Sequence, residues 1–160
     1  MNRQPRTSDT TSPAMSLDEN PPELLFESRF GRLLRRGRWE FVQRTRASGA
    51  VIIVAVTAEN CVLLVEQFRE PVNCRVIEFP AGIAGDEPGG EDEPLLTAAR
   101  RELLEETGYE ADEWHTAFTG ASSAGLTDER ATFFIARGLR KVQPGGGVES
   151  EEITDRKSVV

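Results

Sequence analysis

The chain has 160 residues, a formal net charge of −8 and two cysteines, Cys61 and Cys74. This length fits one domain that buries roughly 70% of its unfolded surface without disulfides. The negative charge argues against non-specific binding to nucleic acids or anionic membranes, and no apolar run has transmembrane length. Because the cysteines lack metal-type spacing and His115 is the single histidine, we expect reduced thiols in a cytoplasmic protein and no serine- or cysteine-type triad.

The N-terminal segment, residues 1–22, is rich in Ser, Thr, Pro and Asn and nearly lacks large apolar side chains. A segment of this composition cannot bury enough apolar surface to fold, so we expect a disordered tail before a domain at residues 23–160. Its two arginines among hydroxyl residues resemble a transit peptide, and Met15 is an alternative start. We favour a plain tail.

The first part of the domain is predicted to consist of strands. Apolar and polar residues alternate, as in a β-meander, in three short segments, residues 24–26, 33–34 and 39–44. Residues 35–38, Arg-Arg-Gly-Arg, supply a basic turn. Residues 50–56 form an apolar, β-branched run that is suited to a central strand, and residues 61–68 are expected to be its hairpin partner.

A helix is predicted after this region. Asp92 or Glu93 can cap its N-terminus, with Pro94 at the first helical position, where a missing N–H costs nothing. Gly108 supplies the left-handed residue that ends a helix. The apolar stripe that would pack on the core consists of Leu96, Ala99 and Leu103.

The exposed face of this helix is predicted to carry a dense group of carboxylates. Glu102, Glu105 and Glu106 stand at positions i, i+3 and i+4, so their side chains project from one stripe. Three like charges in that arrangement repel one another, and the natural occupant of such a face is a hard divalent cation, typically Mg²⁺. The alternative is an acidic, solvated helix face with ordinary capping.

The sequence of this helix also carries a family resemblance. Glu93 is followed, after seven residues, by R-E-L-L-E-E-T-G-Y at residues 101–109. The pattern resembles the second half of the Nudix hydrolase signature, G-x5-E-x7-R-E-U-x-E-E-x-G-U with U apolar. The first half departs from it, because ten residues rather than five separate Gly82 from Glu93. The extra residues read as a surface loop, where insertions cost little, and Glu91 is an alternative for the role of Glu93.

Two further segments, V-E-Q-F-R-E-P-V at residues 65–72 and I-E-F-P-A-G at residues 77–82, resemble the ADP-ribose and nucleotide-sugar pyrophosphatase branch of that family. In all, the resemblance covers roughly residues 24–153. It implies an α+β fold, the Nudix α/β/α sandwich with a mixed sheet and a catalytic helix. It implies a Mg²⁺ site, with Mn²⁺ possible, whose ligands are the Ala81 carbonyl, Glu102 and Glu106. Glu105 would join when more than one ion binds.

The same resemblance assigns roles around the metal. Arg101 would hold the glutamates by charge-assisted bonds, and Arg69 would face the diphosphate. The substrate-binding residues that it implies are Trp39, Arg69, Glu78 and Gly82. Trp39 stands where this branch often has an aromatic residue that stacks on adenine, commonly across a homodimer interface. The alternative is a core tryptophan in an antiparallel strand.

The general base and the substrate stay open at this point. In similar enzymes the base comes from a late loop, here residues 145–152, which contains Glu151 and Glu152. Glu105 is the other candidate, and an acidic loop without a catalytic role is also possible.

The expected reaction is hydrolysis of ADP-ribose or another nucleoside diphosphate sugar to a nucleoside monophosphate and a sugar phosphate. The segment near Ala124 lacks the proline usual in ADP-ribose enzymes, which leaves GDP-mannose open. Two further classes of protein remain, a nucleotide-sugar-binding module that does not cleave and a structural acidic domain.

The last part of the chain is predicted to add two strands, residues 114–119 and 131–136, around a loop at residues 120–129. Relatives continue from there through a further strand and a long helix. The ending D-R-K-S-V-V at residues 155–160 is what a common sequencing adapter encodes. We therefore hypothesise that the domain is truncated at about Thr154 and lacks its C-terminal helix.

Overall fold

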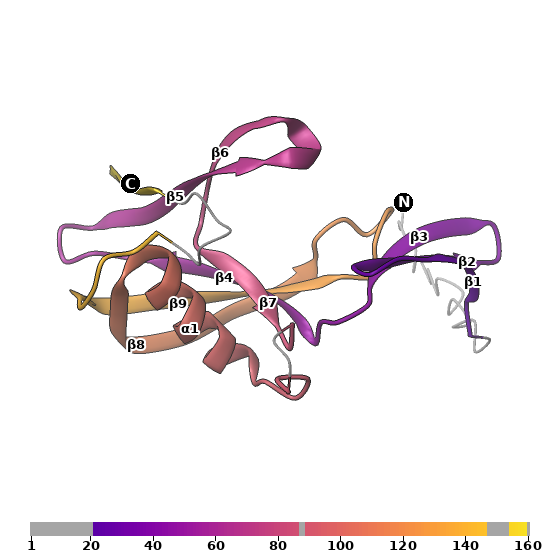
Figure 1. Ribbon diagram of the computed structural model, residues 1–160. Helices are drawn as coiled ribbons and strands as arrows, with labels where there is room; N and C mark the ends of the chain where they lie inside the picture. The colour runs from indigo at the N-terminus through magenta and orange to yellow at the C-terminus, as the bar shows by residue number, and fades with distance from the viewer. Residues whose placement is uncertain (1–20, 87–88, 147–153, 160) are drawn as a thin grey trace, which may run out of the picture.

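The computed structural model describes residues 21–86 and 89–146 and the backbone of residues 154–159 (Figure 1). Most of the expected tail, and the two late-loop glutamates Glu151 and Glu152, lie outside the described residues. The described chain contains one α-helix, α1 (Leu95–Thr107), and a single turn of 3-10 helix, Glu70–Val72. Among the described residues, no helix is both long and apolar enough to cross a membrane.

The strands form three sheets. An N-terminal sheet consists of β1 (Glu23–Glu27), β2 (Gly31–Arg36) and β3 (Trp39–Arg44). The main sheet has the order β7 (Ala81–Ala84), β4 (Gly49–Ala55), β9 (Arg130–Lys141) and β8 (Tyr109–Ala121). The third sheet has the order β10 (Thr154–Val159), β5 (Cys61–Arg69) and β6 (Cys74–Glu78). The meander and all the predicted strands are therefore present.

The main sheet is mixed, as predicted. β4 runs parallel to β9, with Ala50 opposite Ala131, and antiparallel to β7, with Ile52 opposite Ala81. β8 pairs with β9 in a long antiparallel ladder. Sheet and helix together make the mixed α+β fold that the sequence predicts.

The predicted hairpin between residues 50–56 and residues 61–68 is wrong. The chain does turn there, with Asn60 in the left-handed region at φ 58°, but a single bridge between Val56 and Val62 is all that joins the two strands. β4 already has β7 on one edge and β9 on the other, so it has no free edge to offer. β5 instead leaves the main sheet and pairs with β6 and β10.

The core lies between α1 and one face of the main sheet (Figure 1). Ala98, Ala99 and Leu103 on the helix are fully buried against side chains of β4, β7 and β9. The expected apolar stripe is therefore correct for Ala99 and Leu103, but Leu96 is 37% exposed and Ala98 takes its place. Packing on this core fixes which face of α1 turns toward β7.

The sequence predicts the C-terminal end of α1 correctly but not the cap at its N-terminal end. Gly108 ends the helix in the left-handed conformation at φ 72°, as expected. At the other end Pro94 itself is the cap residue, and no side chain bonds to the first turn. The prediction that Asp92 or Glu93 caps the helix is wrong, because the Glu93 carboxylate bonds to Arg101 instead.

Candidate active site

The site begins where α1 approaches β7. A Cβ atom added at Gly82 would lie 1.9 Å from the carboxyl carbon of Glu102, so only glycine lets the two elements come this close. One residue earlier, the backbone N–H of Ala81 donates to Oε2 of Glu106 at 3.1 Å. The carboxylates of Glu102 and Glu106, one helical turn apart, therefore both lie against the same dipeptide of β7.

Glu106 is buried and Glu102 is largely covered, which corrects the prediction of an exposed acidic face. Glu106 is 2% exposed, and the Glu102 side chain is 12% exposed. Glu105, at 33% side-chain exposure, is the member of the trio that remains open to solvent. Helix and strand close over Glu102 and Glu106 because the small residues Ala81 and Gly82 face them.

Arg101 ties the acidic side chains together. Its Nη1 donates to Glu102 at 2.8 Å and to Glu105 at 3.3 Å. Its Nε and Nη2 each donate to the Glu93 carboxylate at 3.2 Å, and Nη2 also donates to the Ile83 carbonyl at 3.2 Å. The guanidinium has five N–H donors, and these bonds use all of them. Arg101 therefore fixes the direction of Glu102 while it is itself bonded to β7 through the Ile83 carbonyl.

Glu93 holds the far side of Arg101 despite the longer loop that precedes the helix. Its carboxylate accepts the two bonds from Arg101 and a third, at 3.4 Å, from the backbone N–H of Gly85. Glu91, the alternative raised by the sequence, supplies only a backbone carbonyl near Gly85. The inserted residues thus lie between Gly85 and Glu93 and leave this pair in place.

Burial and ion pairing shift three pKa values here. Burial raises the pKa of Glu102 to about 7, against the opposing effect of Arg101. The hydrogen bonds from Arg101 hold the pKa of Glu93 below its ordinary value. Burial lowers the pKa of Arg101, but its pairs with Glu93, Glu102 and Glu105 outweigh this and raise the value above the ordinary one. A nearby cation stabilises the ionised form of such a covered carboxylate, so cation binding at Glu102 is electrostatically favourable.

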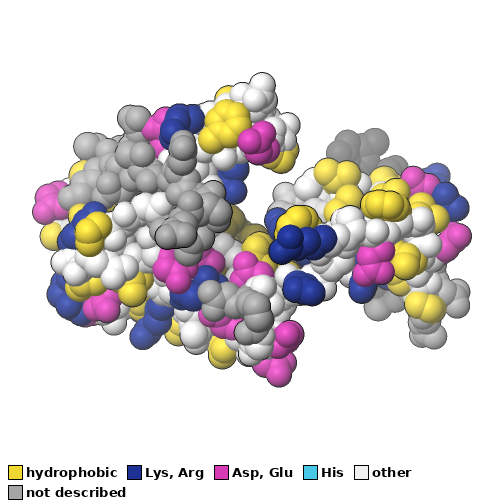
Figure 2. All heavy atoms as spheres, in the orientation of Figure 1, with side chains coloured by type: hydrophobic (Ala, Val, Ile, Leu, Met, Phe, Trp, Pro, Cys, Tyr) yellow, Lys and Arg dark blue, Asp and Glu magenta, His cyan; other side chains and the backbone are white. Residues whose placement is uncertain are grey.

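A cleft of about 340 Å³ opens beside these carboxylates. It brings together five of the residues predicted from the sequence, namely Arg69, Ala81, Gly82, Glu102 and Glu106. Figure 2 shows the surrounding hollow between the main sheet and the N-terminal sheet, with Lys and Arg side chains on the side of the N-terminal sheet. A cleft with acidic and basic walls suits a ligand that is anionic and binds through a cation.

Glu78 reaches this region through Arg69. The Nε of Arg69 donates to the Glu78 carboxylate at 2.7 Å, across the β5–β6 ladder. The pair is partly exposed, at 42% and 30% of the two side chains. Glu78 is therefore placed to set the direction of the Arg69 guanidinium, while Arg69 itself lines the cleft.

Most of the residues that line the cleft were missed by the sequence reasoning, among them Arg44, Gln67 and Glu129. Arg44 at the end of β3 pairs with Glu129, which follows the loop after β8, and both line the cleft. Gln67 lines it as well and is 7% exposed. Nothing in their local sequence marks Arg44 and Glu129 as partners, because they are distant in the chain. A buried amide at Gln67, inside an apolar strand, was the available signal.

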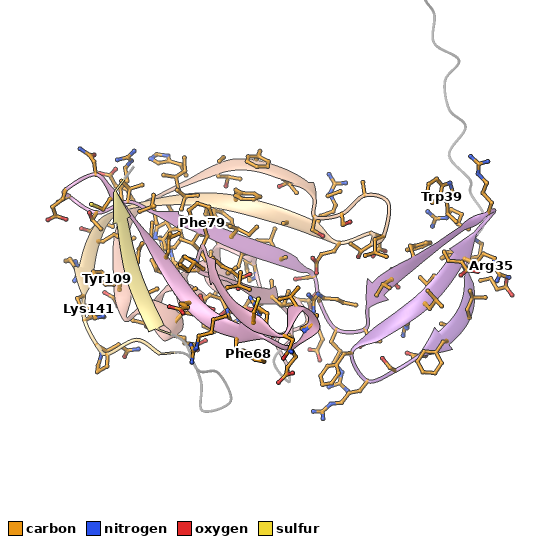
Figure 3. The ribbon with its side chains drawn as sticks, turned by 90° about the horizontal axis from the view of Figure 1, so that it is seen from above. Arg35, Trp39, Phe68, Phe79, Tyr109 and Lys141 are labelled. Carbon is orange, nitrogen blue, oxygen red and sulfur yellow. The ribbon has the colours of Figure 1, made fainter. Side chains whose placement is uncertain are left out.

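Trp39 is not brought to the cleft. It is 59% exposed, so the alternative of a core tryptophan is wrong. Figure 3 shows it at the free end of the N-terminal sheet, away from the rest of the molecule. A contact between Trp39 and a ligand in this cleft would have to involve a second copy of the chain.

A glycine-rich segment crosses the C-terminal end of α1. The backbone N–H of Gly146 donates to the Glu106 carbonyl at 2.9 Å, and Lys141 Nζ donates to the Thr107 carbonyl at 3.1 Å. A Cβ at Gly145 would lie 2.5 Å from the carbonyl carbon of Thr107. Residues 141–146 thus satisfy helix-end carbonyls next to Glu106 and lead directly to the acidic residues 149–152.

The donor set fits a hard divalent cation. Glu102 and Glu106 present carboxylate oxygens beside the backbone of Ala81, and oxygen ligands are those that Mg²⁺ and Mn²⁺ prefer. Within the described ranges, no three Asp, Glu, His or Cys side chains converge as a metal-binding group. The oxygen donors that the described residues bring together at this junction are therefore the carboxylates of Glu102 and Glu106.

Fold and site together define a mixed α+β domain with a buried carboxylate pair at a helix–strand junction. The chain belongs to the Nudix family, since the model of the NUDIX domain matches residues 45–157. It is 40% identical over 110 residues to the methanol dehydrogenase activator of Bacillus methanolicus, covering 69% of this chain and 57% of that protein.

Two other relatives have names that describe a reaction. The ADP-ribose pyrophosphatase of Bacillus subtilis (strain 168) is 36% identical over 107 residues, which cover 67% of this chain and 55% of that protein. The GDP-mannose pyrophosphatase of Salmonella arizonae is 34% identical over 133 residues, which cover 78% and 65%. This chain thus spans between half and two thirds of the length of these relatives.

A crystal structure of an ADP compounds hydrolase has a similar fold. The TM-score is 0.66, and the match covers 91% of this chain and 81% of that one. The sequence identity is 20%, so this likeness bears on the fold alone.

Proposed function

We propose that this chain is a Mg²⁺-dependent hydrolase that cleaves the diphosphate of ADP-ribose or a related nucleoside diphosphate sugar. The products are a nucleoside monophosphate and a sugar phosphate. The observation that carries the proposal is the placement of Glu102 and Glu106 against Ala81 and Gly82, in a cleft that Arg69 also lines. The ADP-ribose and GDP-mannose pyrophosphatases among its relatives support this substrate class.

Each residue has a separate task in this proposal. Glu102, Glu106 and the Ala81 carbonyl hold the cation, and Arg101 keeps Glu102 in place through its 2.8 Å bond. A bound Mg²⁺ supplies charge neutralisation at the diphosphate oxygens. Arg69, oriented by Glu78, binds the diphosphate. Gly82 leaves room for the Glu102 carboxylate beside the substrate.

The reaction also needs a base that takes a proton from the attacking water. Water attacks one phosphorus, and the bond from that phosphorus to the bridging oxygen breaks. Glu105 is one candidate, because its carboxylate is partly exposed and held by Arg101. Glu151 and Glu152 are the others, in a segment that follows the anchor of Gly146 on the Glu106 carbonyl. Mg²⁺ as the cation, with Mn²⁺ as the alternative, and a cytoplasmic location are parts of the same proposal.

We further propose a homodimer that uses the N-terminal sheet. Leu24, Phe26 and Trp39 are 51%, 65% and 59% exposed on it, and large exposed apolar side chains are candidates for a protein interface. A second copy would cover these side chains and allow Trp39 to reach the nucleobase of a substrate bound to its partner.

The experiment that tests the function measures nucleotide release by the purified chain with Mg²⁺. ADP-ribose, GDP-mannose and ADP-glucose are compared at equal concentration, with and without EDTA. We expect release that EDTA abolishes, with AMP from ADP-ribose placing the chain with the ADP-ribose enzymes. A preference for GDP-mannose would move the proposal to that substrate, which the relative at 34% identity supports.

A variant separates hydrolysis from mere binding. Glu106→Gln removes one carboxylate charge and keeps the shape, and we expect turnover to fall about 10³-fold or more. Glu113→Gln, on the exposed face of β8, is the matched control and should leave turnover unchanged. Unchanged hydrolysis in Glu106→Gln would refute the metal assignment. Substrate binding with no release by the unaltered chain would favour a module that binds nucleotide sugars without cleaving them.

A further inference from the structure

A second cavity lies on the other side of α1 from the cleft. Its volume is about 470 Å³, against about 340 Å³ for the cleft. We call it the rear cavity; it is lined by Thr97, Arg100, Arg101, Leu104, Glu110, Ala111, Trp114 and Arg140. Thr97, Arg100 and Leu104 stand at i, i+3 and i+7, so they share one face of the helix. At 3.6 residues per turn, that face points away from Glu102 and Glu106.

The floor of the rear cavity is apolar and held in place. Its Trp114 indole N–H donates to the Ala111 carbonyl at 3.1 Å. The indole ring also meets Phe134 edge to face, with 6.3 Å between the ring centroids. Leu104 adds an aliphatic wall from α1. A ligand would therefore find an aromatic surface whose orientation is already set.

The rim of the rear cavity is basic, in a chain whose net charge is −8. The Arg100 guanidinium carbon lies 5.8 Å from the Trp114 ring centroid, and within the described part of the chain no carboxylate forms an ion pair with it. Arg140 pairs with Glu110 at 3.3 Å and Asp112 at 3.4 Å, and its side chain is 58% exposed. Exposed pairs of this kind are weak, so Arg140 can turn toward an incoming anion at little cost.

We propose that the rear cavity is a binding site for a nucleoside monophosphate. The base contacts the Trp114 indole and the Arg100 guanidinium, both of which stack on planar rings. The phosphate binds Arg140, and Arg100 lines the same cavity. The volume is within the range of small-molecule sites. Arg101 borders both this cavity and the carboxylates of the cleft. The contacts proposed for the nucleotide use Trp114, Arg100 and Arg140 and need no metal, so binding here can be tested separately from the proposed hydrolysis.

Tryptophan fluorescence tests the proposal. The chain has two tryptophans, so a Trp39→Phe variant reports on Trp114 alone. We expect AMP, titrated in EDTA, to change this fluorescence with saturation. Arg100→Ala and Arg140→Ala, each added to that variant, should raise the dissociation constant at least about tenfold. Arg137→Ala is the matched control, since Arg137 is exposed on the same strand as Arg140 and should leave binding unchanged. Adenosine and ribose 5-phosphate should both bind more weakly than AMP.

Other outcomes would overturn the proposal. One is the absence of a saturable change; another is the same dissociation constant in Arg100→Ala and Arg140→Ala as in their parent. A signal that Arg69→Ala abolishes but Arg100→Ala preserves would assign the binding to the cleft instead. Circular dichroism shows whether the Trp39→Phe variant folds. If it does not, the dissociation constant of AMP is measured by calorimetry in EDTA for the unaltered chain and for Arg100→Ala, and the two constants are compared.

Discussion

The main sheet with α1 and the N-terminal sheet are built in opposite ways. The first surrounds a continuous core that includes Val51, Ile53 and Leu103, all fully buried. In the N-terminal sheet, Leu34 is the one residue that counts among the buried hydrophobic residues of the described chain. Phe26 and Trp39 in the same sheet are more than half exposed. The main sheet with α1 is therefore stabilised by its own core, whereas the N-terminal sheet depends on contacts with its surroundings.

Within the described residues, three polar contacts link the N-terminal sheet to the segment between β8 and β9. The backbone N–H of Val42 donates to the Leu126 carbonyl at 2.8 Å, and Gln43 Nε2 donates to Asp128 at 2.6 Å. The third is the pair of Arg44 with Glu129. All three involve the segment between β8 and β9, and all are polar, so they fix position without burying the apolar side chains. These contacts therefore set the position of the N-terminal sheet but leave its large apolar side chains uncovered.

The largest expected effect is a loss of stability from a core truncation. Leu103→Ala leaves a cavity where α1 packs on the main sheet, and it should lower the free energy of unfolding by about 2–5 kcal/mol. Phe26→Ala in the N-terminal sheet should change it by about 0.5 kcal/mol or less in dilute solution, because Phe26 is 65% exposed. Urea unfolding at two protein concentrations measures both. A Phe26→Ala cost that grows with concentration would indicate that a second copy covers this side chain.

The next effect concerns geometry rather than stability. Gly82→Ala would place a Cβ 1.9 Å from the Glu102 carboxyl carbon, so the Glu102 side chain must move. Turnover should fall about 10²-fold, because a shift of about 1 Å in a reacting group has that cost. Stability should change little, since the displaced atoms are the end of a flexible side chain. Gly125→Ala, with no atom within 4 Å of its Cβ, is the control. Equal turnover in both variants would contradict the placement of Glu102 in the site.

A third effect depends on pH. Arg101 lowers the pKa of Glu93 in the folded state below its value of about 4.5 in the unfolded state. The ion pair therefore stabilises the fold fully above pH 4.5, and this stabilisation is lost as the pH falls through the pKa of the folded state. Glu93→Gln should therefore cost about 1.5–3 kcal/mol at pH 7, and the difference from the parent chain should shrink below about pH 4.5. Thermal unfolding across pH 3–7 measures it. Glu91→Gln is the control, and a larger loss in that variant would restore Glu91 as the partner of Arg101.

The smallest effect is expected on the surface of the N-terminal sheet. Arg32 pairs with Glu27 at 2.9 Å, with 41% and 46% of the two side chains exposed. Such pairs are screened by water and salt, so Arg32→Ala should change stability by about 0.5 kcal/mol or less. A double-mutant cycle with Glu27→Ala measures the pair itself. A coupling energy well above about 1 kcal/mol would mean that the sheet is more enclosed than in a single copy of the chain.

Features with local causes were the ones that the sequence predicted. Gly108 ends α1 because a left-handed residue is needed there, and the spacing of Glu102 and Glu106 places both on one face. The burial of that face was not predicted, because it depends on the approach of Gly82 from another element. Glu93 shows the limit most clearly. Its local sequence favours a helix cap, yet Arg101, two helical turns later, binds its carboxylate more strongly.

Long-range partners could not be read from the chain. The hairpin expected between residues 50–56 and residues 61–68 is reasonable from their proximity, but both edges of β4 belong to strands that come later. The pair of Arg44 with Glu129 likewise joins two segments with no common pattern. Such contacts form only in the assembled sheet, so the hydrophobic periodicity and motif spacing of the sequence do not predict them.

The parallel pairing of β4 with β9 has a consequence for how the chain folds. Ala50 lies opposite Ala131, so roughly eighty residues must be synthesised between the two central strands before they can meet. The N-terminal sheet closes through neighbouring strands and can form far sooner. During synthesis on the ribosome, the apolar side chains of that sheet would therefore emerge first and stay exposed until the main sheet forms. Glu102 and Glu106 would reach β7 before β9 exists, but their buried site would be complete only with this late strand.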